Sequence, residues 1–160
     1  MNLLSRDEFG DMLKRMRISK RLQRDIRYVP EEITHIGERD FLTVRTKTGA
    51  EGVLLFGEYC VPFTLKKRSA NVKGRVEAII CDICSTWQRG TNSAVITFKT
   101  SDRSTVSHLV CADLDCSLHV RDLTDAAKIS RTQLREHITP SERAGRLRRR
   151  ILKIMTTASL

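Results

Sequence analysis

The chain has 160 residues, a length that suits one domain or a small domain with a helical appendage. Hydrophobic residues make up 40% and aromatic residues 5%, so we expect a core with few large rings and a need for another source of stability. Lys and Arg number 29 against 19 Asp and Glu, a net charge of +10 that favours acidic partners, either nucleic acid or acidic protein surfaces.

The sequence carries no sign of export or membrane insertion. Its first residues become charged at Arg6 and lack the apolar stretch of a signal peptide. No run approaches the roughly 18 to 20 apolar residues of a spanning helix. We therefore expect a cytoplasmic protein without a membrane partner. In that reducing compartment, cysteines at fixed spacing serve as metal ligands or catalytic groups more often than as disulfides.

Residues 5 to 26 are predicted to form a helix that docks on a core. Ser5 and Glu8 fit a capping box, in which each side chain satisfies a free backbone N–H at the helix start. Apolar residues then recur at helical spacing and predict one buried face, made of Phe9, Met12, Leu13 and Met16.

From about residue 40 the pattern changes to a period of two, which predicts strands. Segments 41–46 and 52–65 are rich in β-formers and flank a turn-forming KTGAEG stretch. Pro62 interrupts the second segment, which predicts an edge strand or a break there. The basic stretch KKRSANVKGR that follows is expected to be a loop or linker.

The C-terminal part combines a predicted hairpin with two helical segments. Residues 93–100 and 104–110 are expected to pair as strands, and the chain turns helical after Cys111. A last helix is predicted to begin at Thr139, with Pro140 in its first position and Glu142 closing a capping box. The expected apolar face of this helix consists of Leu147, Ile151, Ile154 and Met155.

Four cysteines follow the spacing C-x2-C-x26-C-x4-C, at Cys81, Cys84, Cys111 and Cys116. A tight turn, a hairpin and a helix start would bring these thiolates to one tetrahedral zinc ion, as in a treble-clef finger. Two alternatives remain open: a redox CxxC pair and buried free thiols. Four thiolates would leave no open position for a substrate, so the predicted zinc is structural. His108 could replace one ligand, and Cys60 lies outside the pattern.

No motif for enzymatic chemistry accompanies the cysteines. The chain lacks the phosphate-binding glycine loops, the nucleophile elbow and the H-E-x-x-H helix. Its four histidines are scattered without a neighbouring nucleophile and orienting carboxylate. We therefore predict a non-enzymatic protein with no small-molecule substrate.

The end of the chain is strongly basic. Between residues 131 and 153 there are seven Arg and one Lys against two Glu. On a helix, these residues predict a cationic face that either is solvated or contacts phosphates or acidic side chains. The residues of this face are Arg143, Arg146, Arg149, Arg150 and Lys153.

The segments CDICSTW and CADLDCSLHVR resemble the C-terminal treble-clef zinc finger of the elongation factor G-binding family, which includes the bacterial fusidic-acid-resistance proteins. The most specific features are the C-x4-C spacing, the Ser after its second Cys and the V-R pair. The basic helix RLRRRILKIM is also similar, so the resemblance covers residues 75 to 155. In the resistance proteins, binding helps to free the factor from a stalled ribosome.

The resemblance implies zinc ligands at the same four cysteines and a role in translation through binding of elongation factor G. An alternative is a ribosome- or RNA-binding finger that acts through the basic helix. We expect an α+β fold: a small antiparallel sheet with a treble-clef finger and helices at both ends. A helix and strand region (1–74) would precede the finger domain (75–160). The predicted partner contacts are Trp87, Phe98, Lys99, Arg103, His119 and Arg121.

Overall fold

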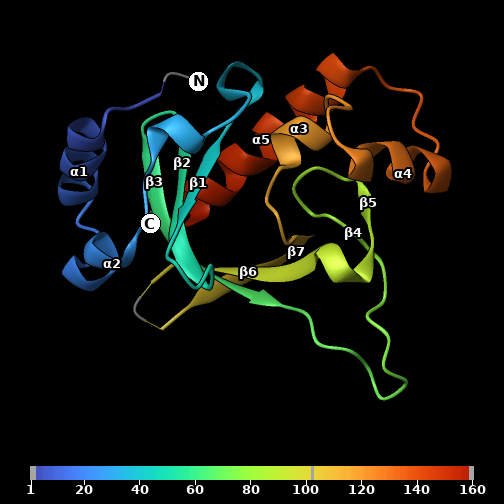
Figure 1. Ribbon diagram of the computed structural model, residues 1–160, viewed down its shortest axis with the longest axis horizontal. Helices are drawn as coiled ribbons and strands as arrows, with labels where there is room; N and C mark the ends of the chain where they lie inside the picture. The colour runs from blue at the N-terminus through green and yellow to red at the C-terminus, as the bar shows by residue number, and fades with distance from the viewer. Residues whose placement is uncertain (1–2, 102, 159–160) are drawn as a thin grey trace.

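A computed structural model of the chain describes residues 3–101 and 103–158 and contains one main sheet with helices on both of its faces (Figure 1). The α-helices are α1 (Arg6–Arg15), α2 (Lys20–Asp25), α3 (Cys116–His119), α4 (Asp125–Gln133) and α5 (Pro140–Ala158). The strands are β1 (Leu42–Arg45), β2 (Glu51–Phe56), β3 (Tyr59–Lys67), β4 (Ile79–Ile80), β5 (Trp87–Gln88), β6 (Ser93–Lys99) and β7 (Thr105–Cys111). Short 3-10 turns are η1 (Pro30–Glu32), η2 (Ile36–Glu38) and η3 (Gly90–Asn92).

The main sheet is antiparallel throughout, with the strand order β1-β2-β3-β6-β7. Its register places Thr64 of β3 opposite Thr97 of β6, which in turn lies opposite Ser107 of β7. Strands β4 and β5 form a separate two-stranded pair that brackets the first two cysteines. The small antiparallel sheet, the clustered cysteines and the flanking helices confirm the predicted fold class.

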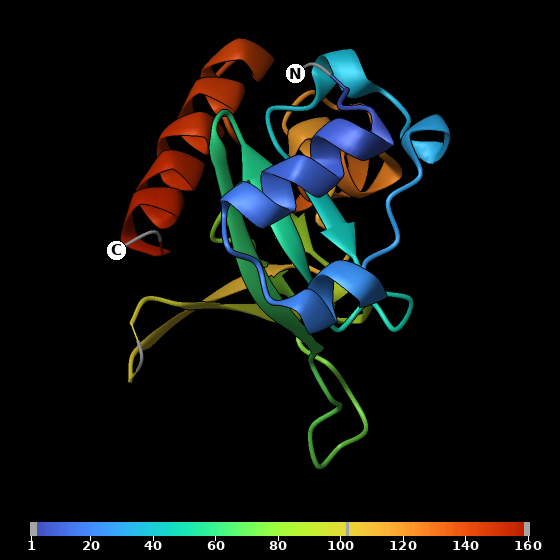
Figure 2. The same ribbon diagram turned by 90° about the vertical axis from the view of Figure 1, so that its left-hand side faces the viewer.

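Two apolar clusters lie on opposite faces of the sheet, because successive side chains of a strand point to opposite sides. On β2, Leu54 joins the larger cluster, while Val53 and Leu55 join the smaller one. The larger cluster, here the metal-side core, contains the four paired cysteines and the buried face of α5. The smaller one, the helix-side cluster, lies under α1 and α2. In Figure 2, α1 and α2 lie in front of the strands, and α5 lies apart from these two helices at the left of the view.

The predicted N-terminal helix is two helices. The Ser5–Glu8 capping box is present, and Phe9 and Leu13 are buried as expected. After α1, however, Arg17 takes a left-handed φ of 53°, which reverses the chain before α2 begins. The break brings Leu22 of α2 onto the same apolar cluster as α1. A continuous helical pattern could not reveal it, because each half is compatible with a helix.

The second predicted strand segment is also divided, into β2 and β3. Gly57 has a φ of 56° in the tight turn between them, a conformation that glycine adopts readily. Pro62 lies within β3, opposite Val53 of β2, while pairing with β6 starts only at Phe63. At Pro62 the strand therefore has one neighbour, so the missing N–H of proline leaves no ladder bond unmade.

The predicted boundary at residue 74 falls in the loop between β3 and β4, and β3 pairs with β6 across it. The two predicted segments thus share one sheet. In the C-terminal part, Thr139 and Glu142 form the expected capping box. The apolar face of α5 is buried against the metal-side core as predicted.

Candidate metal centre

The first ligand pair lies in a tight turn between β4 and β5. Cys81 N–H donates to the Thr86 carbonyl at 3.0 Å, and Ser85 N–H donates to the Cys81 carbonyl at 2.8 Å. Asp82 ties this turn to β7: its N–H donates to the Leu109 carbonyl at 2.8 Å, and its carboxylate accepts the Leu109 N–H at 2.7 Å. Hydrogen bonds of the protein itself therefore hold this turn from two directions.

The second pair lies where β7 meets α3. Cys111 is the last residue of β7 and Cys116 is the first residue of α3. Between them, Leu114 has a left-handed φ of 60°, and its N–H donates to the Cys111 carbonyl at 3.1 Å. This turn reverses the chain, so the unusual four-residue spacing still brings both sulfurs to one point. Burial of the Leu114 side chain stabilises the turn.

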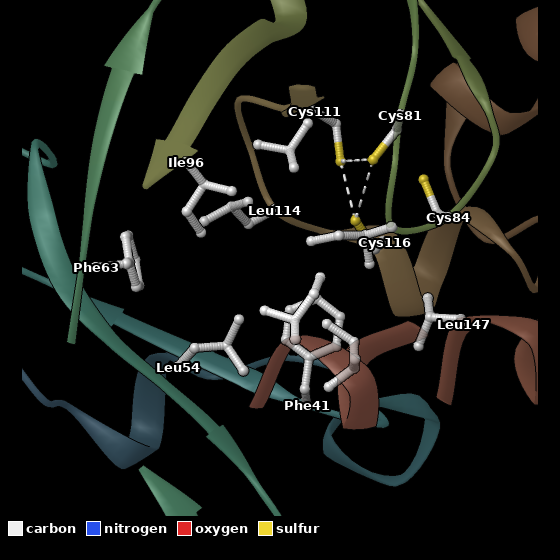
Figure 3. Packing of buried hydrophobic residues seen from close by; sticks show 14 of the residues in the cluster. Phe41, Leu54, Phe63, Cys81, Cys84, Ile96, Cys111, Leu114, Cys116 and Leu147 are labelled. Atoms are coloured by element: carbon white, nitrogen blue, oxygen red, sulfur yellow. Dashed lines mark hydrogen bonds between the residues drawn. The ribbon is translucent and has the colours of Figure 1, made fainter. Parts of the chain in front are cut away.

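The structure brings the four cysteines together, and their Sγ atoms all lie within 4.8 Å of one another. In a tetrahedral site with Zn–S bonds of about 2.3 Å, the sulfurs are about 3.8 Å apart. The Cys81 sulfur lies 3.9 Å from that of Cys111 and 3.8 Å from that of Cys116, and the last two are 3.2 Å apart (Figure 3). This buried, all-sulfur set fits a structural zinc ion with a closed shell.

The buried thiols of this cluster shift one another's pKa values in opposite directions. Burial raises the pKa of Cys81, but hydrogen bonding with Cys111, Cys116 and Cys84 outweighs it and lowers that pKa well below its usual value. Hydrogen bonding with Cys116 and Cys81 raises the pKa of Cys111, and burial raises that of Cys116. A divalent ion bound by all four sulfurs would offset the charge of four buried thiolates.

A pair formed by a buried imidazole and a half-buried carboxylate supports the loop between Cys111 and Cys116. The side chain of His119 is 1% exposed. Its Nε2 lies 3.2 Å from the Asp113 carboxylate, and its Nδ1 lies 2.7 Å from the Thr124 hydroxyl. Burial opposes ionisation of Asp113, but His119, the Asp115 N–H and Asn92 together lower its pKa to about 2. The ionised carboxylate thereby fixes the loop that carries two ligands.

Residues of β1 and of the segment before it hold the same loop. Arg45 donates to the carbonyls of Ala112 and Asp113, each at 3.2 Å. Arg39 forms an ion pair of 2.9 Å with Asp115, and its side chain is 13% exposed. The metal loop is thus positioned by the N-terminal half of the chain.

Asp40 makes a second connection between the halves. Its N–H donates to the Ser117 hydroxyl at 3.0 Å. Its carboxylate, 6% exposed, pairs with Arg121 at 2.7 Å and Arg148 at 3.0 Å. Sequence reasoning missed Arg39, Asp40 and Arg45 because 67 to 81 residues separate them from their partners within residues 112–121. No local pattern marks such contacts.

The predicted partner contacts occupy different environments. Phe98 is fully buried in the metal-side core and His119 supports the metal loop, so the prediction that these two contact a partner is wrong. Phe98 lies on the face of β6 that packs into the metal-side core, and His119 lies on the buried side of α3. The alternation of residues along a strand does not by itself show which face is buried. Arg121 is half-buried and engaged by Asp40.

The other three residues of that set have exposed or partly exposed side chains. Trp87 is half-buried on β5 and lines a small cavity with Ala126 and Ile129 of α4. Lys99 and Arg103 lie at the exposed end of the β6–β7 hairpin. These residues remain predicted contacts.

The cationic face of α5 is largely used within the protein. Arg143 is 6% exposed and pairs with Asp122, so it is not solvated and its charge is used within the protein. The burial follows from its place on the inner side of α5. Arg146 pairs with Glu136, and the side chain of Arg150 donates to the Asp82 carbonyl and the Ser85 hydroxyl. Arg149 and Lys153 form no ion pair among the described residues.

A groove of about 540 Å³ lies beside the first cysteine pair, between β7 and α5. Its apolar lining includes Ile80, which is 53% exposed, together with Val106 and Ile154. Arg150 and Lys153 of α5 add positive charge to its lining. The one feature of the sequence that could have indicated this groove is Ile80, an apolar residue that ends β4 beside the metal turn.

Cys60 stands apart from the metal centre, in the helix-side cluster. Burial raises the pKa of its thiol to about 12. The side chain is therefore a buried, protonated thiol, as its isolation from the cysteine pattern suggested.

No helix within residues 3–101 and 103–158 is long and apolar enough to cross a membrane. The sequence matches the family described as FBP C-terminal treble-clef zinc-finger over residues 18–157. No curated protein and no solved structure matches the chain.

Proposed function

The chain belongs to the FBP C-terminal treble-clef zinc-finger family, and on this basis we propose that it binds translation elongation factor G at or near the ribosome. Binding would modulate release or turnover of the factor in the bacterial cytoplasm. The zinc ion stabilises the binding surface, and the protein itself is not an enzyme. The observation that carries the proposal is the family match together with the four-cysteine centre.

The closed shell supports a binding role in place of catalysis. Catalytic zinc keeps one position for water or substrate, whereas four buried thiolates fill every position. His119, whose side chain is 1% exposed, is paired with Asp113 and supports the metal loop.

The groove between β7 and α5 is the surface that best suits this partner. Exposed Ile80 supplies an apolar centre, which protein interfaces need, and Lys153 supplies positive charge for an acidic rim on the factor. Asp82 and Ser85 join this groove directly to the metal turn. Zinc binding therefore shapes the proposed interface. Lys99 and Arg103 are proposed as a second point of contact.

Calorimetric titration of the zinc-loaded protein into the elongation factor G of the same host tests the proposal. We expect micromolar or tighter binding with modest salt dependence. Ile80→Ala and Lys153→Gln should each weaken binding about fivefold to tenfold, equivalent to about 1 kcal/mol.

Two neighbouring changes serve as matched controls. Leu152→Ala and Arg149→Gln alter an exposed leucine and an exposed cation of α5 that do not line the groove. They should bind like the parent protein. Absence of binding by the parent protein would refute the proposed function. Equal losses in controls and groove variants would refute only the assignment of the groove.

A further inference from the structure

A projecting basic loop follows β3 and is not used by the metal centre or the groove. This loop, the basic finger, comprises residues 66–77 and extends from the body of the molecule in both views (Figures 1 and 2). Val72 near its end has a relative exposure of 107%, so nothing in the described chain covers it.

Backbone hydrogen bonds give the end of the finger a defined shape. The Asn71 side-chain oxygen accepts the N–H groups of Lys73 and Arg75, each at 3.0 Å. Asn71 N–H donates to the Arg75 carbonyl at 2.8 Å. Gly74 has a φ of 71°, which closes the turn without the steric cost of a side chain. The finger presents its side chains from an ordered turn.

The root of the finger is fixed to the body. Arg68 N–H donates to the Ser93 carbonyl at 3.2 Å, and its guanidinium donates to the Glu77 carbonyl at 2.9 Å, which joins the two arms. On the second arm, Val76 lies so close to Gly90 that a Cβ on Gly90 would be 1.8 Å from the Val76 carbonyl oxygen. Only glycine permits this contact. A fixed root lowers the entropy lost when the finger binds.

The cations of the finger are available to a partner. Lys66, Lys67, Lys73 and Arg75 have exposed side chains and form no ion pair among the residues that the structure describes. The contrast with α5 is clear, because there Arg143, Arg146, Arg148 and Arg150 are bound by groups of the protein itself.

The surface next to the finger carries hydroxyl groups, together with the exposed Leu109 and the half-buried Val95 on the same face. Thr64, Thr97 and Ser107 form a row across β3, β6 and β7, and Thr97 and Ser107 share a hydrogen bond of 2.7 Å. Lys66 lies two residues beyond Thr64 on β3 and therefore points to the same face. Beside this row is a hollow of about 490 Å³ that Thr64 and Thr97 help to line.

We propose that the basic finger and the adjoining threonine–serine row bind the phosphate backbone of RNA. Protein interfaces are depleted in lysine and have an apolar centre, whereas the apolar residues of this surface, Val72, Val95 and Leu109, lie beside lysines and hydroxyl groups. Spaced cations and hydroxyls are the groups that contact phosphates. The choice of RNA over DNA rests on the proposed function, since a protein that acts in translation works beside RNA.

Titration of a labelled RNA duplex with the zinc-loaded protein at several salt concentrations tests this inference. The finger variant combines Lys67→Gln, Lys73→Gln and Arg75→Gln, which leave the backbone bonds of the finger in place. It should bind RNA at least about tenfold more weakly, and the log–log salt slope should become shallower by about 2.

The matched control removes the same charge from the C-terminal region, through Arg135→Gln, Arg149→Gln and Lys153→Gln. It should keep most of the RNA affinity. Equal losses in both variants would overturn the inference, because net charge alone would then explain binding. Equal affinity for a DNA duplex of the same sequence would overturn the assignment to RNA. Circular dichroism and zinc content establish that both variants fold.

Binding to elongation factor G, measured on the same samples, separates the two proposals. The finger variant should bind the factor like the parent protein. A specific loss of factor binding in that variant would place the finger in a protein interface and overturn the inference. Failure of all factor binding with RNA binding intact would overturn the proposed function alone.

Discussion

The two faces of the sheet are stabilised by different means. The metal-side core surrounds four cysteines, and its ligand loop depends on bonds that reach across the chain. The helix-side cluster contains no metal ligand and consists of apolar residues of α1, α2 and the strands beneath them. One face combines metal binding with packing, and the other relies on packing and helix capping.

The difference shows how a chain with 5% aromatic residues obtains a stable core. Zinc binding contributes roughly 10 to 16 kcal/mol in finger peptides, which is comparable to the net stability of a whole domain. Burial of Phe9, Leu13 and Leu22 contributes only about 2 kcal/mol for each side chain. The two faces should therefore respond very differently to chelation and to substitution.

Removal of zinc has the largest expected effect. Chelation should expose the loops of residues 81–84 and 111–116 first, because these loops are then no longer joined through the ion. Hydrogen exchange followed by mass spectrometry should show faster exchange in these segments than in α1. Simultaneous exposure of all segments would contradict the distinction between the two faces. Cys116→Ser should reproduce the effect, whereas Cys60→Ser should retain zinc.

Leu147→Ala tests packing within the metal-side core. Leu147 is fully buried, so its truncation should lower the free energy of unfolding by about 3 to 5 kcal/mol. Leu152→Ala, at a position 45% exposed on the same helix, should change it by less than about 0.5 kcal/mol. Chemical denaturation of zinc-loaded protein gives both values. Similar losses in the two variants would show that α5 does not pack as described.

Asp40→Asn tests the connection between the two halves. Arg121 and Arg148 would lose a nearly buried carboxylate, at a cost of about 2 kcal/mol. Because the Arg121 guanidinium that Asp40 positions also donates to the Ser117 carbonyl of α3 at 2.9 Å, zinc affinity should fall about tenfold in a chelator competition assay. Asp11→Asn, at an exposed site, is the control. Unchanged zinc affinity would show that the metal loop does not depend on the N-terminal half.

Ser5→Ala should have the smallest effect, a loss of about 1 kcal/mol from the cap of α1, with zinc affinity unchanged. The hydrogen bonds with Ser5 lower the pKa of Glu8 below its usual value, so the variant should raise it. The capping box therefore stabilises the helix at pH values above the usual pKa of glutamate. This stabilisation is lost as the pH falls through the lowered pKa of Glu8. Nuclear magnetic resonance titration of Glu8 measures the change. An unchanged pKa would contradict the capping box.

Local patterns were sufficient for much of the fold. The Ser5–Glu8 box, the β6–β7 hairpin and the Thr139–Glu142 cap all follow from neighbouring residues, and each is present. The break at Arg17 was missed because both flanking segments have helical periodicity. The turn at Gly57 was missed because the apolar residues around it continue one pattern.

By itself, the sequence determined the zinc centre, because ligand type and spacing are properties of the chain and a tetrahedral ion requires four such groups. Only the tertiary structure decided which charged residues remain free for a partner. Arg143 and the finger residue Arg75 have the same chemistry, yet one is buried against Asp122 and the other is exposed. The physical reason is that the availability of a charge depends on contacts made by residues far away in the sequence.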